Sequence, residues 1–218
     1  MAAEIVLARH GETTGQSSIR LHGATDVPLS ALGIRQIERV AAALAADVSA
    51  GVPGRPFAAV LASPLGRSRT AAEIVAARLG GATPVTVVPE FTEVDFGRWE
   101  GLTVDEVALR DPDNYARLHA EGLDFTYPGG ESRRVFWERV QAGAHRVLAP
   151  VSTRVVAVLH KGVIKAVIAA LTGISHAEAW ALPVSLGGIY RLRPRSPGRW
   201  DIHVQNATEH LGELDVGG

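Results

Sequence analysis

The stretch Leu7-Ala8-Arg9-His10-Gly11-Glu12-Thr13 decides the fold that we expect for this chain. It ends an apolar run, Ile5 to Ala8, that predicts a buried strand. The run stops abruptly at a cationic side chain, an imidazole and a glycine that lets backbone approach a bound group closely. In open α/β sheets, ligands bind beyond the carboxyl ends of the strands. The stretch therefore predicts an α/β protein with a site where its first strand ends.

Two later apolar runs also deliver cationic or imidazole side chains to the junction between a strand and a helix. The predicted strand 58–62 leads through Arg67 and Arg69 into a helix over 70–79, and the predicted strand 155–159 leads through His160 into a helix over 163–171. Helix N-termini favour anions through their free N–H groups and the helix dipole. The three junctions together predict a site for an anionic ligand.

The remaining segments complete an alternation of helices and strands. They are a helix that starts after Ser30 and stops by the breakers at 51–54, a strand at 85–88, an irregular stretch at 90–101, short helices within 102–127, a helix over 134–148, a hairpin of 188–192 with 200–204, and a fraying end at 212–218. This pattern predicts a three-layer α/β/α sandwich with a mostly parallel sheet and an antiparallel edge. We expect one domain over 1–218, with a small helical cap inserted at about 98–134.

Composition limits the classes of function. The 218 residues are 46% hydrophobic and carry a formal net charge of −1 from 22 basic and 23 acidic residues, which does not favour a nucleic-acid or membrane binder. Disulfides, thiolate catalysis and cysteine-bound zinc are excluded because the chain has no cysteine. There is no leader-like or membrane-spanning apolar run, so a cytoplasmic protein is expected.

Phosphoryl transfer through a histidine has requirements that particular residues could meet. His10 would attack phosphorus as a neutral imidazole, and Arg9 and Arg67 would hold the phosphate oxygens as bidentate clamps. His160 would donate a hydrogen bond to the developing charge, and Glu93, with a pKa raised by apolar neighbours, would protonate the leaving alkoxide. No cofactor or metal is required by this scheme.

Sequence motifs spread over nearly the whole chain resemble those of the histidine phosphatase superfamily, the phosphoglycerate mutase-like proteins. The matching elements are Arg9-His10-Gly11-Glu12-Thr13, the loop from His22 to Ser30, the Ser63-x-Leu65-x-Arg67 element with Thr70 and Ala71, the element from Glu93 to Gly101, Pro128-x-Gly130-Glu131-Ser132, and His160-x-Gly162 after a strand. The resemblance implies the same roles for His10, Arg9, Arg67, Glu93 and His160.

The resemblance also suggests substrate-binding residues and shows two departures. Gln16 stands where the family often has a phosphate-contacting Asn, and Lys161 stands where it often has Gly. We count Gln16, His22, Gly23 and Gly162 as candidate substrate-binding residues. Lys161 could add charge near the substrate or point to solvent.

Competing residues have plainer interpretations. Arg69 is expected at the surface, Glu90 is expected to be solvated, and Glu12 is expected to orient the first loop. The other histidines show no ligand-like spacing, so no metal site is predicted; they are His22, His119, His145, His176, His203 and His210. The aromatic residues Trp99, Tyr115, Phe125 and Tyr127 could line a pocket or pack the core and cap.

The sequence thus predicts a metal-independent phosphomonoesterase that acts on a small phosphorylated metabolite through a phosphohistidine. A phosphoglycerate mutase is a weaker alternative, because the acidic end 213–218 would repel a bisphosphate. A non-catalytic phospho-ligand-binding module is weaker still, because His10 and Glu93 are both present. A homodimer is left open.

Overall fold

A computed structural model of the chain describes residues 3–49, 56–196 and 198–217. Its centre is a mixed sheet with the strand order β3-β2-β4-β1-β5-β6. The strands are β1 (Glu4–Arg9), β2 (Ala59–Ala62), β3 (Val85–Val87), β4 (Arg154–Leu159), β5 (Ile189–Ser196) and β6 (Arg199–Ala207). The first four run parallel, whereas β5 pairs antiparallel with both β1 and β6. This confirms the predicted parallel sheet with an antiparallel edge.

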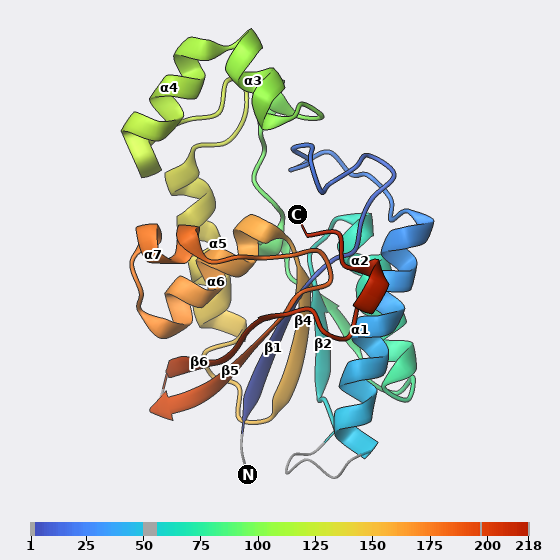
Figure 1. Cartoon of the computed structure of the whole chain (residues 1–218). Coiled ribbons are helices and arrows are strands. Elements are labelled where there is room, and N and C mark those ends of the chain that lie inside the picture. Colours follow the sequence, from blue (N-terminus) through green and yellow to red (C-terminus); the bar gives the residue numbers. More distant parts are fainter. Residues whose placement is uncertain (1–2, 50–55, 197, 218) are drawn as a thin grey trace.

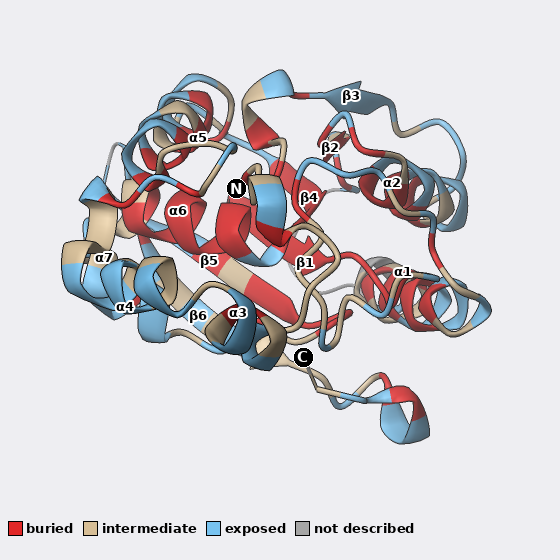
Figure 2. Ribbon diagram, turned by 90° about the horizontal axis from the view of Figure 1, so that it is seen from above, coloured by how far each residue is buried: buried red, intermediate tan, exposed pale blue. Residues whose placement is uncertain are grey.

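Helices cover both faces of the sheet, as the view from above shows (Figure 2). One face carries α1 (Ala31–Ser49) and α2 (Gly66–Arg78), and the other carries α5 (Arg133–Val147) and α6 (Lys161–Thr172), beside which α7 (His176–Ala181) packs. Along β1, Ile5 and Leu7 face the second group while Val6 and Ala8 face the first. Both faces are buried, which explains why the central strands read as continuous apolar runs. The three-layer α/β/α fold is confirmed.

A small helical segment lies beyond the carboxyl ends of the strands (Figure 1). It contains α3 (Val104–Arg110), α4 (Pro112–Glu121) and the short 3₁₀ turn η3 (Gly122–Asp124). Two further 3₁₀ turns, η1 (Pro89–Phe91) and η2 (Gly97–Trp99), interrupt the irregular stretch that precedes it. Helix α3 begins with a capping box between Thr103 and Glu106. We call the part formed by α3, α4 and η3 the helical segment.

Several predicted boundaries were wrong. Helix α2 begins at Gly66 rather than 70, so Arg67 lies in its first turn, and α6 begins at Lys161 rather than 163. Helix α7 was not predicted. Strand β5 extends through Ser196 into the predicted turn, of which residue 197 lies outside the described residues. The breakers at 51–54 also lie outside them.

The C-terminal stretch does not fray as expected. It forms a 3₁₀ turn, η4 (Gly212–Leu214), in which Leu214 is buried. The Gln36 amide donates a 2.9 Å hydrogen bond to the Leu214 carbonyl, and Gly217 accepts one from Leu186. One buried leucine and two hydrogen bonds therefore fix a segment whose composition indicated disorder. Within the described residues, no helix is long and apolar enough to cross a membrane.

Candidate active site

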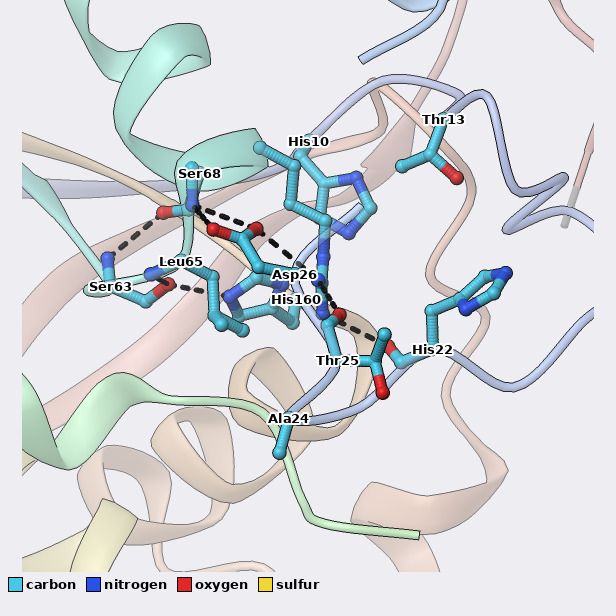
Figure 3. Close-up of polar contacts among 12 residues, drawn as sticks. His10, Thr13, His22, Ala24, Thr25, Asp26, Ser63, Leu65, Ser68 and His160 are labelled. Carbon is cyan, nitrogen blue, oxygen red and sulfur yellow. Dashed lines mark hydrogen bonds and ion pairs between the residues drawn. The ribbon is translucent and has the colours of Figure 1, made fainter. Parts of the chain in front are cut away.

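Three strand–helix junctions meet at one edge of the sheet, because β1, β2 and β4 are parallel neighbours. His10 follows β1, Arg67 lies in the first turn of α2, and His160 follows β4 as the residue before α6. The rings of His10 and His160 lie edge to face with centroids 5.1 Å apart. Figure 3 shows His160 close to the Ser63 turn, with His10 and the loop at 22–26 near it.

His10 is held as a neutral imidazole with one fixed tautomer. Its side chain is buried, and its Nδ1 lies 2.7 Å from the carbonyl oxygen of Gly11. A carbonyl only accepts, so Nδ1 donates the proton and Nε2 keeps its lone pair. Burial, reinforced by Arg67 and Arg9, holds the pKa of His10 well below its usual range. The Nε2 atom of His10 therefore keeps a free lone pair at neutral pH.

His160 is buried beside a serine hydroxyl. Its Nε2 lies 2.6 Å from Oγ of Ser63, and that oxygen also accepts a 3.2 Å hydrogen bond from the backbone N–H of Leu65. Burial and the charge on Arg67 lower the pKa of His160 well below its usual range. Its Nδ1 has no hydrogen-bond partner within the described part of the chain. His160 therefore keeps one buried ring nitrogen without a hydrogen-bond partner in this part of the chain.

Two buried arginines supply positive charge to both histidines. The Arg9 guanidinium donates to the carbonyls of Val184 and Ser17, at 2.8 and 3.2 Å. Burial is the main cause that lowers the pKa of Arg9 to about 10, and it also lowers that of Arg67, so both remain cations at neutral pH. The Nε of each arginine is buried without a hydrogen-bond partner among the described residues.

Arg67 orders the loop at 22–26 as well as carrying charge. Its Nη2 donates to the carbonyls of His22 and Gly23, at 2.9 and 2.7 Å, and its Nη1 donates to that of Thr25 at 2.9 Å. The two terminal nitrogens are thus engaged by backbone. Both hydrogens of Nη2 are committed to these carbonyls, whereas Nε and the second hydrogen of Nη1 form no hydrogen bond within the described part of the chain.

Glu93 lies in the stretch between η1 and η2, and its buried carboxyl packs against the first turn of α6. Its Oε2 accepts a 2.9 Å hydrogen bond from the backbone N–H of Gly162, and its Oε1 accepts one of 3.0 Å from Val94. Burial raises the pKa of Glu93, against the pull of these hydrogen bonds and of Arg67 and Arg9. A carboxyl with a raised pKa can carry the proton that an alkoxide leaving group needs.

The candidate substrate-binding residues occupy different places. His22 bonds through Nε2 to the Gly15 carbonyl at 2.7 Å, and Gly23 donates to the Glu100 carboxylate. A Cβ at Gly23 would lie 1.7 Å from the Val94 carbonyl oxygen, so this close approach requires glycine. Gly162 lies beside Glu93, whereas Gln16 is exposed, at a φ of +62°, and its side chain has no hydrogen bond within the described chain.

The competing residues lie where they were expected. Arg69 is exposed, and Glu90 forms a surface ion pair with Arg146 at 2.7 Å. The Glu12 carboxylate accepts hydrogen bonds from the backbone N–H groups of Thr13 and Ser18, so it orients the first loop.

Sequence reasoning missed a clamp on the Glu93 segment. Arg139 of α5 donates to the carbonyls of Glu90 and Thr92, at 2.8 and 2.7 Å, and more weakly to that of Glu93, at 3.3 Å. A bidentate ion pair with Glu131 fixes its guanidinium, at 2.7 and 2.8 Å. No local pattern distinguishes Arg139 from the other arginines of its helix, although Glu131 belongs to the Pro128-x-Gly130-Glu131-Ser132 motif.

A cavity of about 720 Å³ opens beside Glu93 and extends beneath the helical segment toward α7. Trp99, Tyr115 and Tyr127 line it, whereas Phe125 is fully buried and stacks on Trp99 at 5.6 Å between ring centroids. We call this space the cap cavity. Its size falls within the range of small-molecule sites.

Comparisons with known proteins agree with this arrangement. A family model described as the histidine phosphatase superfamily (branch 1) matches residues 5–208. A bifunctional protein of Mycobacterium tuberculosis is 34% identical over 86% of this chain, but the chain spans only 46% of that protein's length. A metal-independent phosphoserine phosphatase of Arabidopsis thaliana is 31% identical, over 97% of this chain and 84% of its own.

Solved structures show the same fold. The α-ribazole phosphatase of Shigella flexneri superposes with a TM-score of 0.79 at 27% identity, covering 94% of this chain and 96% of its own. A mycobacterial glucosyl-3-phosphoglycerate phosphatase superposes with a TM-score of 0.76 at 28% identity, covering 95% and 100%. On the match over 5–208 and this shared fold, the chain belongs to the histidine phosphatase superfamily, branch 1.

Proposed function

We propose that this protein is a metal-independent phosphomonoesterase that hydrolyses a small phosphorylated metabolite through a phosphohistidine on His10. The observation that carries the proposal is the fixed tautomer of His10, whose Nδ1 bonds to the Gly11 carbonyl while its Nε2 faces a site rich in positive charge. The named phosphatases among the relatives support the same activity.

In the first step, Nε2 of His10 attacks phosphorus and the P–O bond to the alcohol breaks. Free donors are available for the phosphoryl oxygens at Nε of Arg9, Nε of Arg67 and Nδ1 of His160. Glu93 gives its proton to the departing alkoxide, which leaves as the alcohol. These charges are preorganised because the donors are buried and their other nitrogens are already bonded to backbone or to Ser63.

In the second step, water attacks the phosphohistidine. Glu93, now a carboxylate, takes a proton from that water, the P–N bond breaks, and phosphate leaves His10 neutral. The acid and base roles thus alternate on one carboxyl.

The segment after β1, the loop at 22–26 and Gly162 would contact the substrate. In the first two segments, the proposed contacts are Gln16, His22 and Gly23. We also propose one domain over 1–218 with the cap at about 98–134.

The test is release of phosphate from p-nitrophenyl phosphate and from a panel of phosphorylated metabolites in the presence of EDTA. We expect turnover in the wild type and none in His10→Ala, with His203→Ala, an exposed histidine on β6, as the matched control. Mass spectrometry of rapidly quenched protein should show one phosphoryl group on the wild type only. Release that disappears with EDTA would contradict metal independence, and release that survives His10→Ala would contradict the phosphohistidine.

The same preparation decides between hydrolysis and transfer. With 3-phosphoglycerate and a bisphosphate primer, we expect free phosphate and no isomerised product. Isomerisation faster than phosphate release would favour a mutase. The cytoplasmic location and a homodimer stay predictions of the sequence.

A further inference from the structure

The cap cavity is the place where the alcohol half of a substrate would lie. Glu93 and Gly162 form part of its lining, so it opens directly onto the carboxyl that would protonate the leaving oxygen. The cavity is far larger than a phosphoryl group. Its lining is mainly apolar and aromatic, with Phe136, Trp137 and Trp180 contributed by α5 and α7.

The charges of the cavity are unbalanced. The chain contains two lysines, Lys161 and Lys165, and both line this cavity together with Arg133. Glu93 is the one carboxylate side chain among the described residues that line it. Across the described part of the chain, none of these three cations forms an ion pair, although basic residues elsewhere commonly do.

The bonds that these cations do make are weak substitutes for a counter-ion. Lys165 is buried, donates to the Trp180 carbonyl and lies 5.0 Å from the centre of the Trp180 ring. Arg133 is also buried and covers the same ring at 4.5 Å, with a long 3.4 Å contact to the Leu118 carbonyl. Cation–π contacts offset only part of the cost of burying a charge.

That cost is visible in the protonation of Lys165. Burial, with the neighbouring charges of Lys161 and Arg9, lowers its pKa to about 8. An apolar side chain would fill this position without the penalty. A buried cation that lines a cavity next to a catalytic constellation is better explained by a ligand than by stability.

Resting on the phosphatase activity proposed above, we propose that the substrate's alcohol has an apolar, ring-sized body and carries a second anionic group, which Lys165, Lys161 and Arg133 bind in the cap cavity. Lys161 and Gly162 lie in the first turn of α6 beside Glu93, and Lys165 follows one turn later. At a rise of 1.5 Å per residue, the backbone of Lys165 lies about 6 Å further along α6 than that of Lys161, so the three cations are spread along the cavity away from Glu93. A carboxylate and a second phosphoryl group share this chemistry.

The kinetic test compares aryl phosphates that differ in the group opposite the ester. We would measure kcat/KM for 4-carboxyphenyl phosphate, its neutral isostere 4-carbamoylphenyl phosphate, and 4-(phosphonomethyl)phenyl phosphate. The wild type should prefer the carboxylate or the phosphonate over the carbamoyl compound by about tenfold or more, as expected for hydrogen bonds to a charged partner. The preferred anion identifies the source as a carboxylate or a phosphoryl group.

Variants of Lys165 and Arg133 test whether these two cations cause the preference. Lys165→Met and Arg133→Met should each reduce the ratio between anionic and neutral substrates toward one. Arg134→Met is the matched control, because Arg134 is the exposed neighbour on α5 and pairs with Asp124 outside the cavity. A wild-type ratio near one, or a ratio that Lys165→Met leaves unchanged, would overturn the proposal.

A binding test keeps this proposal separate from the phosphatase activity. The product analogues 4-hydroxybenzoate and 4-hydroxybenzamide would be titrated against the protein by calorimetry, and acetylation of Lys165 by acetic anhydride would be followed by mass spectrometry. We expect the benzoate alone to bind and to protect Lys165. Selective protection without turnover would sustain the anion site and contradict the activity, whereas equal protection by both analogues would reduce Lys165 to a structural role.

Discussion

The Glu93 carboxyl is hydrogen-bonded to the Gly162 backbone and lies in close contact with it. Oε2 of Glu93 accepts a 2.9 Å hydrogen bond from the Gly162 N–H, and a Cβ on Gly162 would lie 2.6 Å from Oε1 of the same carboxyl. His160 immediately precedes this turn of α6. The helix start therefore fixes the candidate acid and the second histidine relative to each other.

Gly162→Ala tests this relationship. The added methyl group would push the Glu93 carboxyl away, so we expect hydrolysis of alkyl phosphates to fall by about tenfold or more while the protein stays folded. Helix propensity favours alanine over glycine by about 1 kcal/mol, which offsets part of the strain in the folded state. Steady-state kinetics and thermal unfolding on the same sample are the measurements. Full activity in the variant would contradict a fixed position for Glu93.

Glu93→Gln should act through the leaving group. The amide cannot give up a proton, so we expect a loss of about a hundredfold or more on alkyl phosphates and a far smaller loss on p-nitrophenyl phosphate, whose leaving group needs little protonation. The readout is kcat/KM across a series of phosphate esters with leaving groups of different pKa. Equal losses across the series would remove Glu93 from the acid role. Glu90→Gln, at the surface ion pair with Arg146, is the control.

The pH dependence of phosphate release should reflect the lowered pKa of His10 and the raised pKa of Glu93. Because burial and the neighbouring arginines hold the pKa of His10 well below its usual range, the imidazole stays unprotonated at neutral pH, and activity should fall only as the pH is lowered through that depressed pKa. Glu93 has a raised pKa, and it stops acting as an acid once the pH rises through that value. The ratio of alkyl to p-nitrophenyl phosphate hydrolysis should therefore fall as the pH rises. This ratio cancels the titration of His10, and a ratio independent of pH would disagree with the assignment.

The convergence of His10, Arg67 and His160 was predictable from the sequence, because each follows an apolar run and the three runs end at the same edge of a parallel sheet. His10 and His160 needed only the strands before them. The helix starts were less predictable. The N–H of Gly66 is bonded by the Asp26 carboxylate, at 2.8 and 2.9 Å to its two oxygens, and that of Gly162 by Glu93. These partners lie 40 and 69 residues away in the sequence, so no local pattern predicts where either helix starts.

Helix α7 was missed for a different reason. Its capping box, Ser175 with Glu178, is a local signal that could have been found. The six residues that follow are too short to show a helical period. The anchoring of the C-terminal turn depends on the Gln36 amide, which also bonds the backbone N–H of Glu12 at 2.8 Å. Such long-range hydrogen bonds of a side-chain amide cannot be deduced from composition.

Ser63→Ala tests the orientation of His160. The Ser63 hydroxyl is the partner of Nε2, and by donating to it would place the ring proton on Nδ1, the nitrogen free to bind a phosphoryl oxygen. Without the hydroxyl the other tautomer becomes available, so we expect kcat to fall by about tenfold with a smaller change in KM. Kinetics and the ring-nitrogen NMR shifts of His160 are the measurements. An unchanged tautomer and kcat would leave Ser63 with a packing role only.

Stability should depend on a charged cluster at the opposite end of the sheet. Glu4 accepts hydrogen bonds of 3.0 and 2.9 Å from Arg154, which is buried, and it also pairs with Arg191 at 3.3 Å. Glu4→Ala would leave the buried Arg154 with only the more distant Asp47 carboxylate, at 3.8 Å, so we expect a loss of up to about 3 kcal/mol in the free energy of unfolding. Urea denaturation measures this.

The double variant Glu4→Leu with Arg154→Met separates charge from packing at this cluster. It removes both ions and keeps apolar volume over Phe57, whose ring lies 4.3 Å from the Arg154 guanidinium. Neither position then carries a buried charge, so most of the stability that Glu4→Ala loses should return. Kinetic constants should stay unchanged in both variants, since the cluster lies at the amino ends of β1 and β4, away from His10. A double variant as unstable as Glu4→Ala would show that the ion pair itself, and not its imbalance, stabilises the fold.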